Sequence, residues 1–463
     1  MSEPKEISNG ASSRFLEPRT QTDSWVTEKT LRDRAITFSL LPEKSIEKLE
    51  KPSLISSAHG KITGILMTPP WWLFIEKGDF DPIDFADTEI AKIKIERDTL
   101  FSIIKDLPSG TEITFLTTEN VMNSGTLVFS PVKRLEAILK QVGRKDSSKI
   151  ISAPDGLKHS VWAEDAYAMS NDLSDSETFF VEPASFRRGD DALIADLVAS
   201  KSSIIQSQTN LYFQGGNILI GDDFWFIGTD YPKNSLTLGY VKPQNGETEV
   251  EAVTRAYSDA LDHDRKFIQI GSRLPVPSEI EQRFILHGEV WSEKLYRANK
   301  TGTAQPLFHI DMFLTLGGRD DDGRYRVFVG DPDMAAGILG EQTSRYAMAS
   351  IFSDIADQLE AMDFKVVRNP LPLTYIDDPS EKHRSWYFAT SNNALVEIDD
   401  QNKTVWLPTY GHRIWPELKK TDDANKEIWK SEGFKVIQLG DFHPYAENLG
   451  AAHCITKYID RTR

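Results

Sequence analysis

The chain has 463 residues with a formal net charge of −17, and 40% of its residues are hydrophobic. This composition supports a large buried core and argues against a nucleic-acid-binding protein, which usually carries a basic face. No apolar run approaches the roughly 18 residues that span a bilayer, so we expect no membrane contact. Cys454 is the single cysteine, which excludes an intramolecular disulfide and a cysteine zinc cage. One thiol suits a reducing compartment, and we expect a cytoplasmic protein.

The order of expected elements predicts an α/β protein. Residues 1–55 are polar and predict an extension that carries little structure, followed by one domain over residues 56–463. Within that domain, helical patterns repeatedly precede short apolar strands. The expected elements are a strand at 62–69, a helix at 85–107, a strand at 111–118, a helix at 190–201, a strand at 215–220, a helix at 250–261, a strand at 266–271, a long helix within 335–363, a strand at 365–369, a helix at 415–434 and a strand at 435–442. These helix–strand repeats share a pattern of apolar and polar residues but not their residue identities.

An acidic pair follows a tryptophan in the segment SVWAEDAYAM. Glu164 and Asp165 come after Trp162 in an otherwise apolar stretch. Buried carboxylates are costly unless they are paired. The segment is therefore a solvated loop or helix start, or an anionic pocket for a cation with the tryptophan ring beside it.

A histidine and an aspartate lie two positions apart in the run PLFHIDMFLTLGG. A strand would place His309 and Asp311 on one face and Phe308, Ile310 and Met312 on the other. The pair could ligate a metal, form a structural hydrogen bond, or move protons and hold a cationic group. No third or fourth metal ligand is evident, and the contiguous acids in RDDDGRY indicate a hairpin turn, so we expect no metal and no cofactor.

Cys454 lies in NLGAAHCITKYIDR, after His453 and a run of small residues that permits close approach. A lone cysteine is more often a small buried hydrophobe than a nucleophile. Neighbours on a strand point to opposite faces, so His453 is a poor base for Cys454 and a partner must come from elsewhere. His309 is the best candidate for that partner.

The order of these motifs, with QGGN at 214–217 between the acidic pair and the histidine, resembles the guanidino-group-modifying enzymes of the pentein fold. That superfamily includes agmatine deiminase, arginine deiminase, peptidyl-arginine deiminase and the amidinotransferases. The resemblance covers roughly residues 60–463. It implies a five-bladed α/β propeller of pseudo-repeated ββαβ modules around a central active site.

The resemblance also implies roles for individual residues. Cys454 matches the nucleophile, His309 the general acid and base, and Asp165 and Asp311 the two carboxylates that bind the guanidinium. Further positions on the substrate side would be Glu164, Trp162, Gln214, Gly215, Gly216, Asn217 and Asn393. Asn393 has the alternative of a strand-end turn. The glycine pair would let backbone pass close to the ligand.

This chain departs from the family pattern at two of these positions. Gln214 stands where several members that act on small substrates carry an acidic residue, and Glu164 stands where many bacterial relatives carry arginine. A glutamine there removes a charge that could raise the histidine pKa. The change at Gln214 bears on the assignments to free arginine and agmatine more than on the reaction class.

The expected function is a deiminase that hydrolyses the guanidinium of protein-bound arginine or of a small arginine derivative. An amidinotransferase using the same cysteine and a guanidinium-binding protein without turnover are the alternatives. A thiol peptidase fits less well, because paired acids suit a cation better than an apolar groove does. The sequence leaves the substrate and the oligomeric state open.

Overall fold

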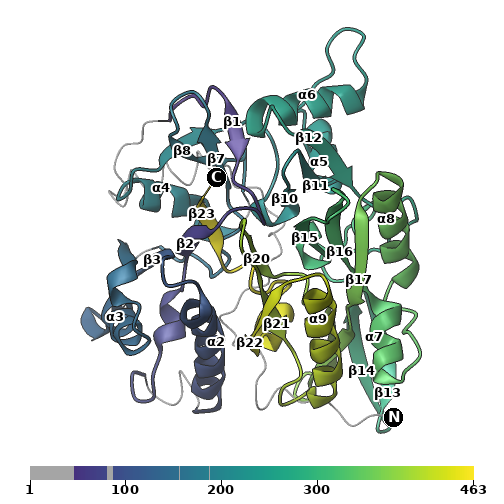
Figure 1. Ribbon diagram of the computed structural model, residues 1–463. Helices are drawn as coiled ribbons and strands as arrows, with labels where there is room; N and C mark the ends of the chain where they lie inside the picture. Colours follow the sequence, from purple (N-terminus) through teal and green to yellow (C-terminus); the bar gives the residue numbers. More distant parts are fainter. Residues whose placement is uncertain (1–45, 81–86, 156, 187, 463) are drawn as a thin grey trace. The chain divides into compact units, whose positions relative to one another are not determined.

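The computed structural model describes residues 46–80, 87–155, 157–186 and 188–462. The first 45 residues of the expected extension lie outside these ranges. Packing divides the chain into two compact units, each assembled from separated segments. Unit 1 contains the described parts of Ile75–Asp106 and Ile270–His453, and unit 2 contains those of Thr20–Phe74, Leu107–Gln269 and Cys454–Arg463. Figure 1 labels helices and strands of both units.

Unit 2 contains sheets in the orders β1-β7-β8-β9, β10-β11-β12 and β23-β2-β3-β6, and the hairpin β4-β5. Its strands are β1 Pro52–Leu54, β2 Ile62–Met67, β3 Glu112–Thr118, β4 Val121–Asn123, β5 Thr126–Phe129, β6 Ser148–Ala153, β7 Ala168–Asp172, β8 Thr178–Glu182, β9 Ile205–Gln208, β10 Ile218–Ile220, β11 Phe224–Gly228, β12 Lys266–Ile270 and β23 Lys457–Arg461. The strand β1 falls inside the expected extension and pairs antiparallel with β7.

The helices of unit 2 cover its sheets and close its apolar core. They are η2 Trp71–Phe74, α3 Pro131–Gln141, η3 Lys145–Ser147, η4 Gly189–Leu193, α4 Ile194–Ala199, η5 Gly215–Asn217, α5 Asp230–Thr237 and α6 Glu249–Leu261. One cluster of buried side chains joins β1, β8, β10, β11 and α6, and Trp225 and Tyr257 are fully buried within it. Such burial of large aromatic side chains supplies much of the stability of a unit this size.

Unit 1 contains sheets in the orders β13-β14-β19-β18, β15-β16-β17 and β20-β21-β22. Its strands are β13 Ile280–Leu286, β14 Glu289–Leu295, β15 Leu314–Arg319, β16 Tyr325–Asp331, β17 Lys365–Pro370, β18 Leu373–Asp378, β19 His383–Phe388, β20 Leu395–Ile398, β21 Lys403–Thr409 and β22 Lys435–Asp441. The acids Asp320–Asp322 form the turn between β15 and β16, as the sequence indicates.

In unit 1, helices α2, α7, α8 and α9 lie against the three-stranded sheets (Figure 1). They are α2 Asp87–Asp106, η6 Ile310–Met312, α7 Pro332–Leu339, α8 Ala349–Ala361, η7 Pro416–Leu418, α9 Lys419–Ser431 and α10 His443–Ala446. The long helix expected within 335–363 is in fact two helices. Gly340 ends α7 in the left-handed conformation with φ of 77°, where glycine carries no Cβ penalty.

One order of strands recurs through both units. A strand pairs antiparallel with a second, which pairs parallel with a third, in β7-β8-β9, β15-β16-β17, β20-β21-β22 and β23-β2-β3. The sheet β10-β11-β12 begins with the same antiparallel pair. A helix precedes the third strand each time, because a parallel neighbour requires a crossover connection. The α/β class is therefore confirmed. In the described part of the chain no helix is long and apolar enough to cross a membrane.

Candidate functional site

In unit 2, the fold brings Cys454 against the acidic pair. The Cys454 side chain is fully buried, and its carbonyl oxygen accepts a hydrogen bond of 3.2 Å from the Glu164 backbone N–H. Cys454 comes just before β23, which pairs with β2 and so fixes the backbone that follows the thiol. The lone cysteine and the segment 162–165 thus share one loop cluster, although 289 positions separate Asp165 from Cys454 in the printed sequence.

Both acids of the pair are buried and hold basic partners. Lys457 Nζ lies 2.7 Å from Glu164 Oε1, and Arg188 Nη1 lies 2.7 Å from Asp165 Oδ2. Arg188 also bridges to Asp191, at 2.6 Å from its Nε. Burial alone would lower the pKa of Arg188, but Asp191 and Asp165 raise it. The alternative of a solvated loop is therefore wrong, because these carboxylates lie in the interior and are paired there.

Backbone of the glycine pair touches the acidic segment directly. The Gly215 N–H donates to the Asp165 carbonyl oxygen at 3.1 Å. A Cβ added at Gly215 would lie 1.9 Å from the Glu164 carbonyl oxygen and 2.9 Å from Lys457 Nζ. Only glycine fits so close an approach. Residues 215–217 form the single turn η5 and not the start of the expected strand, which begins at Ile218.

Gln214 precedes this turn and is fully buried. Neither its Oε1 nor its Nε2 has a hydrogen-bond partner within the residues that the structure describes. Asn217, on the other side of the glycine pair, donates from Nδ2 to the Gly228 carbonyl oxygen at 3.3 Å. Tyr167 is buried nearby, and burial together with Glu164, Asp191 and Asp165 raises its pKa well above the ordinary value.

In unit 1, His309 and Asp311 flank a turn and not a strand. His309 is extended, and the 3₁₀ turn η6 begins at the next residue. The His309 ring stacks on Phe308 with a centroid distance of 4.0 Å, so the expected alternation of faces across this run is wrong. The strand β15 begins only at Leu314. Both side chains are nevertheless buried.

Asp311 has a partner that the sequence did not indicate. Its Oδ2 lies 2.9 Å from Nδ1 of His453, and both residues are buried. Asn393 fixes the surrounding backbone. Its Nδ2 donates to the Asp311 carbonyl oxygen at 3.3 Å, and its Oδ1 accepts from the Ala451 N–H at 2.9 Å. Asn393 is thus a buried connector between η6 and the segment before Cys454, and the division into units falls at the peptide bond between His453 and Cys454.

The structure groups the sequence-predicted residues in two sets. The unit 2 set is Trp162, Glu164, Asp165, Gln214, Gly215, Gly216, Asn217 and Cys454, and the unit 1 set is His309, Asp311 and Asn393. Sequence reasoning missed Arg188 and Lys457 as partners of the acids, and His453 as the partner of Asp311. The apolar surroundings of Lys457 were the available signal, because a charge in an apolar stretch needs a counter-ion.

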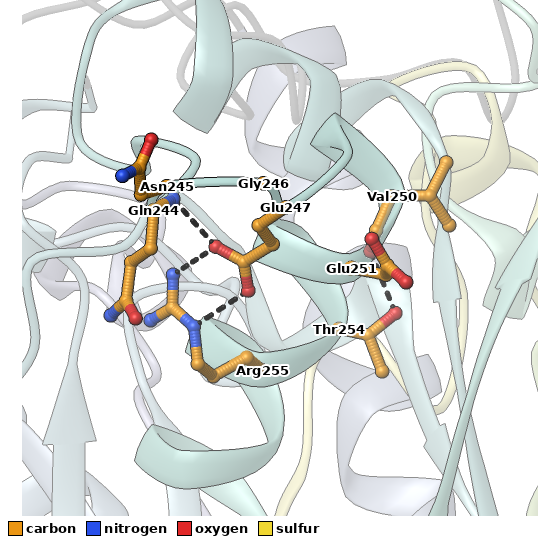
Figure 2. Close-up of a pocket in the computed structure, with 8 residues that line it drawn as sticks. All are labelled: Gln244, Asn245, Gly246, Glu247, Val250, Glu251, Thr254 and Arg255. Atoms are coloured by element: carbon orange, nitrogen blue, oxygen red, sulfur yellow. Dashed lines mark hydrogen bonds and ion pairs between the residues drawn. The ribbon is translucent and has the colours of Figure 1, made fainter.

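An open depression at the start of α6 contains none of these residues. Figure 2 shows Gln244, Glu247, Val250, Glu251 and Arg255 among the residues that line it. Arg255 pairs with both carboxylate oxygens of Glu247, at 2.8 and 2.9 Å, and this pairing lowers the Glu247 pKa to about 2. Within the described residues, no group of three or more His, Cys, Asp or Glu could hold a metal ion.

Comparison with known proteins shows which solved structures have a similar fold. No protein-family model matches the sequence, and no curated protein sequence matches it. The C. jejuni agmatine deiminase is 10% identical with a TM-score of 0.55, and the match covers 91% of this chain and 100% of that one. The Enterococcus faecalis agmatine deiminase is 12% identical with a TM-score of 0.50, over 91% and 100% of the two chains. A further solved structure, described as that of a putative agmatine deiminase, is 12% identical with a TM-score of 0.58, and the match covers 90% of this chain and 98% of that one.

The fold is similar to that of the pentein enzymes. At this level of identity the similarity concerns the fold alone, and it confirms the resemblance drawn from the order of the sequence motifs.

Proposed function

We propose that the chain is a guanidinium hydrolase with Cys454 as its nucleophile, converting a guanidinium to a ureido group and ammonia. The observation that carries this proposal is the hydrogen bond between the Cys454 carbonyl oxygen and the Glu164 N–H, which joins the single cysteine to the acidic segment in one unit. Buried carboxylates in the same loop cluster as a buried cysteine suit a planar cation that presents N–H donors. The substrate is protein-bound arginine or a small arginine derivative.

In the proposed reaction, the Cys454 thiolate attacks the central carbon of the guanidinium and forms a tetrahedral adduct. The carbon–nitrogen bond then breaks, and ammonia departs with a proton from His309. Water adds to the resulting thiouronium carbon and gives a proton back to His309. The carbon–sulfur bond then breaks as the new hydroxyl group loses its proton to solvent, which releases the neutral ureido product and regenerates the thiolate. No oxidant or reductant enters the balance.

The carboxylates would hold the substrate while Cys454 and His309 act on it. Asp311, oriented by His453 and by the Asn393 contact to its carbonyl oxygen, would accept guanidinium N–H groups. Arg188 fixes the orientation of Asp165, which would face the same cation. Gly215 would keep backbone close to the ligand without a clashing Cβ. We further propose that the recurring modules belong to a five-bladed propeller, as in the family.

A guanidinium-binding protein without turnover is the second candidate function. Gln214 favours it, because a neutral side chain stands where an acid could raise the pKa of the acid–base histidine. The ion pair between Arg188 and Asp165 favours it as well, because a substrate would share that carboxylate with a residue of the chain.

Ammonia and ureido-product release separates these candidates. We would measure both products from agmatine, arginine and an arginine-containing peptide, with the wild type beside Cys454→Ala. The proposal expects turnover of at least one substrate and a loss of more than about 10³-fold in the variant. Wild-type protein that gains thermal stability from guanidinium compounds but releases no product would favour the binding-only candidate or an amidinotransferase that lacks its acceptor. Absence of both would exclude the guanidinium proposal.

A further inference from the structure

The strand β13 forms one edge of the four-stranded sheet in unit 1 (Figure 1). It has seven residues, and all of them pair antiparallel with β14 on one side. Among the strands that the structure describes, none pairs with the other side of β13. A free edge of this length presents a row of backbone donors and acceptors that can pair with a further strand.

The β13 edge lacks several features that usually prevent such pairing. Its sequence, IEQRFIL, contains no proline, and its register with β14 runs without a bulge. Ile280 and Ile285 are 41% and 61% exposed. Natural edge strands are usually shortened, bulged, covered or interrupted by proline, because a long and partly apolar edge associates with other strands. The β13 edge is therefore suited to a partner strand.

The turn between β13 and β14 determines which residues of β13 face the free side. His287 and Gly288 have φ of 51° and 82°, as in the two-residue type I′ turns of hairpins. The pair that flanks such a turn, here Leu286 and Glu289, is hydrogen-bonded, and hydrogen-bonded pairs alternate with non-hydrogen-bonded ones along the strands. Every second residue of β13 therefore directs its backbone groups away from β14, namely Glu281, Arg283 and Ile285.

Two of these three residues carry opposite charges. Glu281 and Arg283 are both exposed, and neither forms an ion pair with any residue that the structure describes. Because they are two positions apart, their side chains lie on the same face of the sheet. A free acid and a free base on one face of an open edge can each bind the opposite charge on a partner strand.

A second copy of β13 supplies those charges in one register. Antiparallel pairing requires outward-facing residues of one strand to lie opposite outward-facing residues of the other. When the two-fold axis passes at Gln282, Glu281 of each copy lies opposite Arg283 of the other, and Ile280 lies opposite Phe284. Axes at Glu281 or at Arg283 would instead place like charges opposite each other, which is destabilising.

We infer that β13 is a dimerisation edge, which pairs antiparallel with β13 of a second copy of this chain in the register centred on Gln282. The contact is isologous, since each copy contributes the same residues. It joins the two four-stranded sheets into one continuous sheet. This inference concerns association alone and does not depend on the proposed reaction.

Analytical ultracentrifugation of charge-reversal variants tests the register. We expect the wild type to sediment as a dimer. Glu281→Arg places arginines opposite each other in both cross-strand pairs, so it should raise the dimer dissociation constant at least about tenfold. Arg283→Glu should have the same effect, with acids in place of bases. The double variant Glu281→Arg/Arg283→Glu restores opposite charges and should recover the wild-type dissociation constant.

A mixture of the two single variants gives a sharper test. At a concentration where each variant is monomeric alone, an equimolar mixture should form a dimer. One strand then carries only bases at these two positions and the other only acids, so both pairs are again attractive. Because the variants rescue each other only by pairing, this result also shows that neither substitution has unfolded the chain.

Glu289→Arg is the matched control, because it makes the same charge change at an exposed position on β14, away from the free edge. It should leave the dimer intact. A wild type that stays monomeric up to about 100 µM, or a dimer that both single variants leave intact, would overturn the inference. A dimer lost in Val290→Ser but retained in Glu281→Arg would place the contact on the face of the hairpin, and would overturn the edge pairing as well.

Discussion

At the scale of a single residue, Lys457 supplies the counter-charge that allows Glu164 to be buried. Its ammonium pairs with Glu164 at 2.7 Å, and Nζ would lie 2.9 Å from a Cβ at Gly215. A buried ion pair adds little net stability, but removal of one partner leaves an uncompensated charge. The pair therefore has more to do with the local arrangement of charges beside Cys454 than with overall stability.

Lys457→Met should reduce the free energy of unfolding by about 3–5 kcal/mol, because Glu164 would be left buried and unpaired. Adding Glu164→Gln should restore most of that loss, since the charge is then gone. Chemical denaturation of the wild type, both single variants and the double variant measures the coupling. Additive effects of the two substitutions would show that the pair is not energetically coupled. Lys94→Met, in an exposed pair with Asp98, is the control and should cost little.

The identities of the site residues could be predicted from sequence, but their partners could not. The spacing of His309 and Asp311, the glycine pair and the single cysteine are visible in the letters alone. The contacts of Asp165 with Arg188 and of Asp311 with His453 depend on loops that meet only in the folded chain. Charge in an apolar stretch predicts that a counter-ion exists and does not say which residue supplies it.

At the scale of secondary-structure elements, the Tyr410 backbone forms hydrogen bonds with two buried titratable side chains, Asp422 and His443. It follows β21, its N–H donates to Asp422 on α9 at 2.9 Å, and its carbonyl oxygen lies 2.8 Å from His443 Nε2 on α10. Burial lowers the pKa of His443 to about 4 and raises the pKa of Asp422 to about 6. The two shifts have opposite consequences for stability in acid.

At a pH between its folded and unfolded pKa values, His443 binds a proton mainly in the unfolded protein, whereas Asp422 binds one mainly in the folded protein. Unfolded His443 titrates near 6.5 and folded His443 near 4, so its protonation favours unfolding as the pH falls through that window. Unfolded Asp422 titrates near 3.8 and folded Asp422 near 6, so its protonation favours the folded state as the pH falls from 6 to 3.8. In the wild type the two contributions largely cancel.

Asp422→Asn removes the opposing titration, so the effect of His443 protonation on the free energy of unfolding should become measurable. We expect the free energy of unfolding of this variant to fall between pH 6.5 and pH 4 by about 3 kcal/mol more than that of the wild type. Chemical denaturation across this range measures the two slopes. Asp423→Asn, at the exposed neighbouring position, controls for the loss of a carboxylate from α9. Parallel curves for the wild type and Asp422→Asn would contradict the prediction.

Periodicity predicted many of the strands and helices because they bury one face or one stripe. β2, β3, α6 and β22 appear close to where the sequence places them. The secondary structure of the run through His309 could not be predicted from the alternation of apolar and polar residues. A fully buried 3₁₀ turn and a fully buried strand are both composed of mainly apolar residues. The break between α7 and α8 depended on one left-handed glycine, which is a weak signal in a long apolar stretch.

The net charge of −17 acts at the scale of the whole molecule. An acidic protein attracts a cationic substrate over a distance set by the Debye length, which falls from about 30 Å at 0.01 M salt to about 3 Å at 1 M. We expect kcat/KM for whichever cationic guanidinium substrate the protein turns over to fall by up to about tenfold over that range, because encounter loses its electrostatic steering. Measurement of kcat at saturation is the control, since it does not depend on encounter. A kcat/KM independent of salt would contradict the prediction.

The division into two units was not predicted, because both are assembled from distant segments. Alternation of helices and strands indicates the class of fold but not which segments share a core. In unit 2, β1 pairs with β7, and β2 pairs with β23, the last strand among the described residues. Such pairings have no signature in a local window of sequence.

The pairing of β2 with β23 has a consequence for how the protein folds. Thr63 and Asp460 meet across these strands although they are 397 positions apart. The intervening chain includes the long unit 1 segment, so joining the two strands closes a very large loop. The conformational entropy lost on closing this loop is not offset by local contacts formed earlier. Pairs of high sequence separation form late and slow a chain's folding. We therefore expect β23 to dock last, so that the backbone beside Cys454 becomes ordered only in the final stage of folding.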